Sequence, residues 1–333
     1  QGGRGMLDSF HFRSRAKGIG YVTYMTSTSG PSRVNSAITD MPGKSDLVRL
    51  GVGILGIGSS GPLIALSTMP IPSLIFWRNL GGALATAPFA LKHSLDRRGV
   101  KWSFAAGVVL ALHFIGFFMA MRMTSVAAGT ALVALQPIFA SIFIKVTGGH
   151  IPSKAWLGMA ISFIGVLLIS GIDFSLDRKS FMGDIAAIVS AALAALYVIW
   201  GSKAQESLET TSYTSICYAM CAITALPIAL AGGYQVWGFP SREWWVLLAL
   251  IAGAQILGHS MFNSALKRVS PAVVSLIVFF EVPVAAILAK IFTIGNQPSG
   301  AIIPGIILIL GGCTLVVLRT RPSKEQVDAM VNE

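Results

Sequence analysis

The sequence predicts an all-α integral membrane protein with ten transmembrane helices, arranged as two inverted five-helix repeats. The first observation is composition: 54% of the 333 residues are hydrophobic and only 12% are charged, whereas soluble domains carry about 25% charged residues. The second is an internal repeat with an offset of 146 positions. Its first copy contains His113, Arg122, Pro137, Ala140, Pro152, Ser153 and Gly165, which recur as His259, Arg268, Pro283, Ala286, Pro298, Ser299 and Gly311.

Apolar windows follow one another along the chain, each about as long as the ~20 residues that cross a bilayer core. In the first half we expect spans at 47–67, 73–91, 102–121, 125–146 and 153–172. In the second half we expect spans at 182–202, 212–231, 244–266, 270–292 and 299–318. A large soluble enzyme with buried helices is the alternative, but it would need more polar sequence between the windows.

Short connections favour helix–helix turns between the spans. Gly-Gly-His-Ile-Pro-Ser at 148–153 and Gly-Asn-Gln-Pro-Ser at 295–299 each place a proline near the start of the next helix, where its missing N–H is not needed. The offset of the repeat maps the last three spans of the first half onto those of the second. The first two spans of each half repeat more faintly, as Pro88-Phe-Ala-Leu and Pro227-Ile-Ala-Leu.

An odd number of spans in each unit predicts that the second unit enters the membrane from the opposite side, which gives an inverted repeat. If the N-terminus is cytoplasmic, the cytoplasmic connections hold fourteen Lys and Arg residues and the opposite ones hold five, leaving aside the first forty residues and Arg78. Because positive residues concentrate in cytoplasmic loops, we expect both termini in the cytoplasm and the protein in the cytoplasmic membrane.

Four parts of the chain are expected. The two five-helix repeats should occupy residues 46–172 and 180–319. Residues 1–45 are rich in Ser, Gly and Arg and contain no span-length apolar run, so we expect a disordered or non-native tail, with an organelle transit peptide as the alternative. Residues 320–333 should form a polar cytoplasmic tail.

The remaining composition argues against several classes of function. The net charge is +11, but the basic residues are separated by apolar windows and form no single face for nucleic acid. Cys217, Cys221 and Cys313 fall within spans without accompanying His or carboxylate ligands, so we expect packing and no metal site. No nucleotide-binding loop or catalytic motif is recognisable. We therefore expect no cofactor, no catalytic residues and no enzyme.

The second copy of the repeat resembles the EamA family of the drug/metabolite transporter superfamily. The resemblance lies in the stretch 258–275 and in Phe280-Glu-Val-Pro, and also in Phe76-Trp-Arg-Asn and Leu135-Gln-Pro of the first copy. It covers roughly residues 47–318. It implies ten helices, alternating access for small metabolites, and a central cavity built from helices 1, 3, 4, 6, 8 and 9.

Two departures from this family are visible. Its ninth helix often carries Glu directly before Pro, whereas Val282 separates Glu281 from Pro283 here. The family often has an acidic Gly-Glu turn after the fourth and ninth helices, and here these turns read Gly149-His150 and Gly295-Asn296.

Two ionisable residues inside the predicted spans are candidates for coupling. An ionisable group at the centre of a membrane helix costs about 2.5–3.5 kcal/mol on insertion scales, so it usually has a role or a partner. Glu281, halfway along the ninth span, is a candidate proton site or counter-ion for a cationic cargo group. A structural carboxylate held by an Arg or by backbone amides near Pro283 is the alternative. Arg78 could bind a substrate carboxylate, anchor its helix, or extend to the interface.

Polar residues at matched places in the two copies are candidates for a shared cavity. His113 and His259 are repeat mates near mid-membrane, and Asn263 shares a helix face with His259. A hydrogen-bonded packing role is the alternative for the histidines. Gln136 precedes a proline, and Tyr197 lies in the sixth span, either in the cavity or in the interfacial aromatic belt.

Pro137 and Pro283 free backbone carbonyls in the middle of their helices, and such groups need partners or water. Kinks at matched places in both halves suit a binding site and a hinge. A bend that only fits the helix into the bundle is the alternative reading.

An internal repeat in a polytopic membrane protein is typical of secondary transporters. The sequence therefore predicts a secondary active transporter that moves a small organic metabolite, amino acid-like or related, outward by alternating access, with protons as the candidate coupling ion. A channel, a sensor or a membrane-embedded enzyme are the alternatives. We expect lipid as surroundings and a monomer or homodimer. The expected substrate-binding residues are His113, Gln136, Tyr197, His259, Asn263 and Glu281, and the expected coupling or gating residues are Glu281, Arg78, Pro137 and Pro283.

Overall fold

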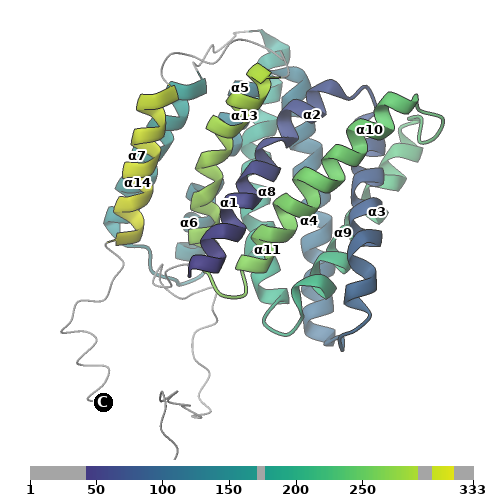
Figure 1. Ribbon diagram of the computed structural model, residues 1–333, viewed down its shortest axis with the longest axis horizontal. Coiled ribbons are helices and arrows are strands. Elements are labelled where there is room, and N and C mark those ends of the chain that lie inside the picture. Colours follow the sequence, from purple (N-terminus) through teal and green to yellow (C-terminus); the bar gives the residue numbers. More distant parts are fainter. Residues whose placement is uncertain (1–42, 171–176, 292–301, 319–333) are drawn as a thin grey trace, which may run out of the picture. The chain divides into compact units, whose positions relative to one another are not determined.

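The computed structural model describes residues 43–170, 177–291 and 302–318, and the regular structure within these residues is entirely helical (Figure 1). The first half contains α1 (Lys44–Gly58), α2 (Ser60–Leu66), α3 (Ile71–Ala90), α4 (Arg97–Met123), α5 (Val126–Val133), α6 (Gln136–Val146) and α7 (Ser153–Ser170). The second half contains α8 (Arg178–Ala204), α9 (Thr210–Ala231), α10 (Ser241–Ala249), η1 (Leu250–Ser260), α11 (Met261–Ala265), α12 (Pro271–Leu276), η2 (Ile277–Phe280), α13 (Glu281–Ile291) and α14 (Ile302–Leu318). The predicted all-α class is confirmed.

Eight helical stretches in the described residues are long and apolar enough to cross a membrane. They are Lys44–Leu66, Arg97–Met123, Val126–Val146, Ser153–Ser170, Arg178–Ala204, Thr210–Ala231, Ser241–Ala265 and Pro271–Ile291. Two predicted spans fall outside this set, because α3 is not among the eight and the apolar stretch in α14 is shorter. The membrane class therefore stands, while the number of ten spans and the inverted repeat stay predictions. The predicted turn at 295–299 and the tails at 1–45 and 320–333 lie wholly or almost wholly outside the described residues.

Several helices begin at a side chain that accepts backbone N–H bonds. Asp96 accepts from the amides of Arg98 and Gly99 at the start of α4, and Asp177 accepts from the Ser180 amide at the start of α8. Such caps satisfy donors that have no partner within the helix. The bond from Gly99 is the largest cause that holds the pKa of Asp96 below its ordinary value.

Four of the membrane segments are interrupted near their middle, and the sequence explains two of the interruptions. A proline cannot donate to the carbonyl four residues before it. The residue four before Pro137 is Val133, where α5 ends, and the residue four before Pro283 is Phe279, within the 3₁₀ turn η2. The other two are the break between α1 and α2 at Ser59 and the π-helix η1.

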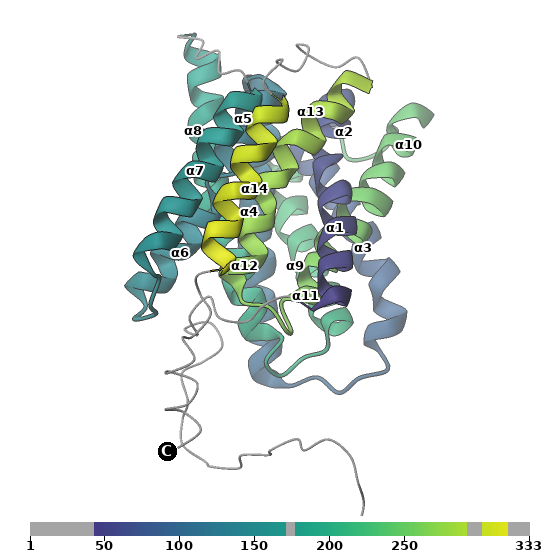
Figure 2. The ribbon, with the colours of Figure 1, turned by 60° about the vertical axis from the view of Figure 1, so that its left-hand side comes forward.

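The most extensive helix contacts each join a segment of the first half to a segment of the second. α4 packs against α8 and α9, α3 against α9, α7 against α14, and α1 against η1 and α11 (Figure 2). The repeat offset places α4 in correspondence with α10–α11 and α8 with α1. Under this offset the α4–α8 contact corresponds to the α1–η1 contact, and both join the first half to the second.

α7 and α14 cross closely because glycines face each other. A Cβ on Gly312 would collide with the Gly158 carbonyl, and a Cβ on Gly305 would lie 2.8 Å from the Gly165 carbonyl. Small residues at a crossing allow this approach of two backbones. The order of these pairs makes the two helices antiparallel, so the end of α14 lies beside the start of α7.

Candidate functional site

One cavity lies among six segments of the bundle: α1–α2, α4, α5–α6, α8, η1–α11 and α12–α13. These are the segments that the sequence resemblance implied. All six side chains expected to bind substrate line this cavity, namely His113, Gln136, Tyr197, His259, Asn263 and Glu281. Their binding role stays a prediction, but the fold brings together residues that are up to 168 positions apart.

The cavity is narrow in this conformation. Its volume open to a water-sized group is about 40 Å³. Because one water needs roughly 10–15 Å³ of such space, there is room for a few waters. A metabolite requires the lining helices to move apart. Apart from the polar residues named, the lining is largely aliphatic and aromatic, as is usual for small-molecule sites.

His113 is fixed by Ser190 of α8. Its Nδ1 lies 3.0 Å from the Ser190 carbonyl oxygen and 2.8 Å from Ser190 Oγ, and Ser190 Oγ donates to the His113 carbonyl at 3.0 Å. The hydrogen of the Ser190 hydroxyl is used on the His113 carbonyl, and the Ser190 carbonyl oxygen can only accept. Nδ1–H therefore donates to the Ser190 carbonyl, and Nε2 is left as an acceptor. Gly116, one turn further along α4, lets the two helices approach this closely.

The repeat mate His259 has different neighbours. Its ring meets Phe114 at 5.4 Å and Tyr197 at 6.0 Å between centroids, both edge to face. Asn263 Nδ2 donates to the Tyr197 hydroxyl at 2.6 Å, which joins α11 to α8. The two histidines therefore face one cavity in different settings, one held by a serine and the other among aromatic rings.

Glu281 is the carboxylate of the cavity. It opens α13 directly after η2 and is 5% exposed. Within the described part of the chain it makes neither a hydrogen bond nor an ion pair. Gln136 across the cavity is tied instead, because its Nε2 donates to Ser275 Oγ at 3.4 Å. The alternative of a structural carboxylate fixed by an Arg thus finds no support in the geometry.

Arg78 and the two prolines do not line this cavity. The Arg78 side chain on α3 is completely buried, with its guanidinium carbon 4.2 Å from the centroid of the Phe114 ring. Pro137 follows Gln136 at the start of α6. Pro283 lies on a separate apolar groove formed with residues of α1, such as Leu50 and Ile54.

The model of the EamA-like transporter family matches residues 47–171 and 181–318 of this sequence. The chain belongs to the EamA-like transporter family. The resemblance noted from the sequence is thereby confirmed, and the protein is a membrane transporter.

Similar proteins support this family. This EamA-like transporter is 25% identical to the uncharacterized transporter YxxF of Bacillus subtilis, over 85% of this chain and 92% of that protein. It is 26% identical to the pseudopaline exporter CntI of Pseudomonas aeruginosa, over 77% of this chain and 89% of the exporter. A crystal structure with 19% identity superimposes with a TM-score of 0.67, over 83% of this chain and 98% of that one, which supports the fold.

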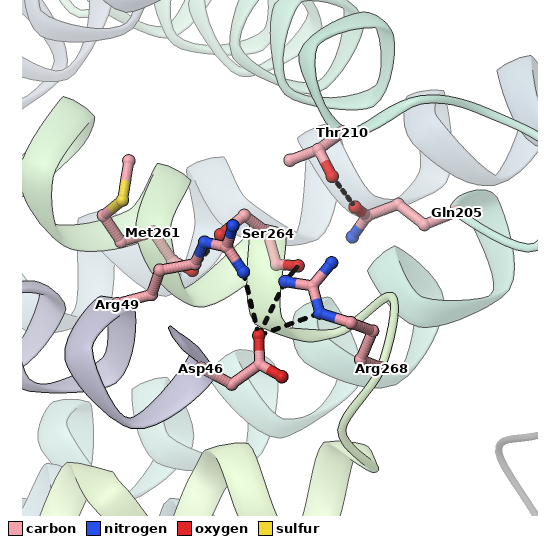
Figure 3. A network of polar contacts seen from close by, with 7 residues as sticks. All are labelled: Asp46, Arg49, Gln205, Thr210, Met261, Ser264 and Arg268. Atoms are coloured by element: carbon pink, nitrogen blue, oxygen red, sulfur yellow. Dashed lines mark hydrogen bonds and ion pairs between the residues drawn. The ribbon is translucent and has the colours of Figure 1, made fainter. Parts of the chain in front are cut away.

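An ion-pair cluster closes one end of the first segment of this EamA-like transporter. Arg268 donates to Asp46 Oδ1 from Nη2 at 2.6 Å and from Nε at 2.9 Å, and Arg49 donates to the same oxygen at 3.0 Å (Figure 3). We call Asp46, Arg49 and Arg268 the Asp46 cluster. It joins the start of α1 to the connection between α11 and α12.

A second cluster lies at the opposite end of the same segment. The buried Glu243 of α10 accepts from Ser67 Oγ at 2.7 Å and from the amide and hydroxyl of Thr68, each at 3.0 Å. Arg122 Nη2 donates to the Met69 carbonyl at 2.7 Å. We call Glu243, Ser67 and Thr68 the Glu243 cluster. The repeat mates Arg122 and Arg268 therefore contact opposite ends of α1–α2.

Sequence reasoning did not identify these clusters or the other residues that line the cavity. Ser60, Phe114 and Phe117 line the cavity, but single Ser and Phe residues in apolar windows carry no distinguishing signal. The repeat of Arg122 as Arg268 was visible and could have indicated a pair of end contacts. Asp46 and Glu243 each fall one residue outside a predicted span, where an acidic residue is unremarkable.

Proposed function

We propose that this protein is a secondary active transporter of the cytoplasmic membrane that exports a small, amino acid-like metabolite by alternating access. Glu281 is the site where protons couple to transport. Both termini lie in the cytoplasm, and the two repeats, 46–172 and 180–319, move against each other around the cavity. An exporter among the similar proteins supports the outward direction.

The observation that carries the proposal is the position of the one carboxylate in the cavity. Glu281 has no hydrogen bond or ion pair to any described residue, and it lies where the ninth segment changes from a 3₁₀ turn to an α-helix. Interrupted helices near a cavity supply free backbone groups and local freedom of movement, as in other carriers. A carboxylate without a fixed partner is available to a proton or to a cationic group.

Competition at this carboxylate provides the coupling. When Glu281 takes a proton, it loses the charge that attracts a cationic group of the cargo. Proton and cargo therefore occupy the site in alternation, which exchanges one for the other across the membrane. Each occupant favours the conformation in which it binds more tightly, as any ligand-driven shift between two states requires.

Alternating access is supported by the two clusters and the packing pattern. The Asp46 cluster and the Glu243 cluster hold opposite ends of α1–α2, so each end has its own polar contacts to form or break. The counterpart contacts α4–α8 and α1–η1 favour a two-fold relation between the halves. Rocking of one half against the other would exchange which end is open.

The experiment compares wild type with Glu281→Gln in proteoliposomes loaded with radiolabelled amino acids. Gln has nearly the same shape but takes no proton at this position. We expect proton-gradient-driven accumulation to fall to the level of protein-free vesicles, whereas counterflow at saturating cargo persists. Counterflow in the wild type separates a carrier from a channel, a sensor or an enzyme.

Glu206→Gln is the matched control, because Glu206 is an exposed carboxylate in the connection between α8 and α9. This variant should keep both activities. Gradient-driven uptake that survives in Glu281→Gln would refute Glu281 as the coupling site. Absence of counterflow by the wild type would refute the carrier itself.

A further inference from the structure

Arg78 is a buried cation without hydrogen-bond partners. Its side chain is 0% exposed, and Nε, Nη1 and Nη2 all lack a partner among the described residues. A guanidinium has five N–H donors, and leaving such a group unpaired in a low-dielectric interior is costly. In native structures, an unpaired buried polar group of this kind requires an explanation.

Aromatic rings compensate only part of this cost. The guanidinium carbon lies 4.2 Å from the centroid of Phe114 and 5.8 Å from that of Phe118. These cation–π contacts use the face of the guanidinium. The N–H donors point along its edges and remain unused, so the aromatic rings hold Arg78 in place without satisfying it.

Phe114 separates this cation from the cavity. The same ring that stacks on Arg78 also lines the cavity and meets His259 edge to face. Arg78 is thus one aromatic ring behind the cavity wall. Access from the cavity to the guanidinium therefore requires the Phe114 side chain to rotate.

The cavity already contains the opposite charge. Glu281 lines it without a fixed partner, and Arg78 and Glu281 interact electrostatically at longer range without forming an ion pair in the described structure. Most of the cavity lining is apolar, including Phe117, Phe262 and Val278. A ligand that satisfies both charged groups carries an anion and a cation on an otherwise apolar body.

We propose that Arg78, reached when the Phe114 ring swings aside, is the subsite for the carboxylate of a zwitterionic amino acid whose amino group is held at Glu281. The proposal rests on the transport function proposed above. A single planar guanidinium matches a carboxylate with two parallel N–H bonds. A phosphate, with its greater charge, would meet repulsion from Glu281 without a second cation on the cavity lining.

The test uses the purified full-length wild type, Arg78→Met and Arg78→Lys. Each of the twenty proteinogenic amino acids is compared with its carboxamide, which keeps the amino group and side chain, by thermal unfolding and titration calorimetry. We expect the wild type to prefer one or more acids over their amides by at least about tenfold, the effect of one charge-assisted pair. Arg78→Met should lose this preference, and Arg78→Lys should keep part of it.

Unfolding of the ligand-free variants distinguishes recognition from structural support. Met removes an unpaired buried charge and still fills the space beside two aromatic rings. Arg78→Met should therefore unfold at the wild-type temperature or above it, by about 2 °C. Phe139→Leu is the control, since Phe139 stacks on Phe143 of the same helix and does not line the cavity. It should leave the acid-to-amide ratio unchanged.

Three results would overturn the proposal: wild type that binds none of the acids, wild type that binds acids and amides equally, or Arg78→Met that retains the preference. Counterflow is measured on the same samples. If the wild type exchanges the amino acids and their carboxamides equally well, the Arg78 subsite is refuted while the transport function remains supported.

Discussion

At the scale of single residues, the charged side chains within the bundle differ in whether they have hydrogen-bond partners. Asp46 and Glu243 accept several hydrogen bonds each, so they link helices. Glu281 and Arg78 have no such bonds to described residues. A charged residue that holds the structure together is expected to have fixed hydrogen-bond partners. A charged residue that meets a ligand is expected to keep donors or acceptors unpaired.

An ion pair outside the membrane segments gives a prediction for pH. Lys267 Nζ lies 2.6 Å from Glu209 Oε2, and this hydrogen bond is the main reason that the pKa of Glu209 lies below its ordinary value of 4.5. A lowered folded pKa means that the pair stabilises the protein above the ordinary value. That stabilisation is lost as the pH falls through the lowered pKa.

Glu209→Gln should therefore reduce the unfolding temperature at pH 7 by about 1–3 °C, since an exposed pair contributes at most ~1 kcal/mol. The difference from wild type should shrink as the pH falls below 4.5 and vanish once Glu209 is protonated in the folded protein, as measured by thermal unfolding in detergent across this pH range. Glu206→Gln controls for loss of a nearby exposed carboxylate. A difference between wild type and Glu209→Gln that is constant with pH would contradict the prediction.

The candidate cavity residues were predictable because each is polar within an apolar window. His113, His259 and Glu281 stand out in this way, and the cavity contains all three. The surroundings of Arg78 were not predictable, because stacking on Phe114 depends on how α3 lies against α4. Among the described residues, the sequence likewise gave no indication that Ser190 would hold His113 and not His259.

At the scale of the elements, the interruptions place the site. The break at Ser59, the end of α5 at Val133, the π-helix η1 and the 3₁₀ turn η2 all lie next to residues that line the cavity. Sequence predicted the interruptions that involve Pro137 and Pro283, because a proline removes a specific backbone bond. It did not predict η1, since π-helical turns carry no such marker.

The α7–α14 crossing gives a prediction with an adjacent control. A Cβ on Gly312 would meet the Gly158 carbonyl and the Ser162 backbone, whereas a Cβ on Gly311 meets nothing within 4 Å. Gly312→Ala should therefore force the helices apart and reduce the unfolding temperature by at least about 4 °C, by analogy with other overpacked sites.

Gly311→Ala should leave the unfolding temperature unchanged or raise it, because alanine favours a helix over glycine. Both variants are measured by thermal unfolding of purified protein. Equal effects of the two substitutions would show that the change in unfolding temperature comes from helix propensity and not from the helix crossing. The repeat alone favoured Gly311 as the mate of Gly165, so the sequence identified the helix but not its contacting face.

At the scale of the whole molecule, the two polar clusters lie at opposite ends of the bundle. In Figure 1 the start of α1 and α11 are at the lower end, and α2 and α10 are at the upper end. The Asp46 cluster joins the first pair and the Glu243 cluster joins the second. Because both hold the same segment α1–α2, loosening one end should favour the conformation in which the other end is closed.

This gives the prediction for the complete transporter, tested by hydrogen–deuterium exchange. Asp46→Asn removes the carboxylate that two arginines share, so peptides covering 44–50 and 262–270 should exchange faster while those covering 64–72 and 240–247 exchange more slowly. Glu243→Gln should produce the reverse pattern. Arg242→Gln is the control, because Arg242 is 61% exposed and pairs with Glu243 at 3.6 Å, leaving the Ser67 and Thr68 bonds in place. Faster exchange at both ends in either variant would indicate general loosening and would contradict an opposite response at the Asp46 cluster and the Glu243 cluster.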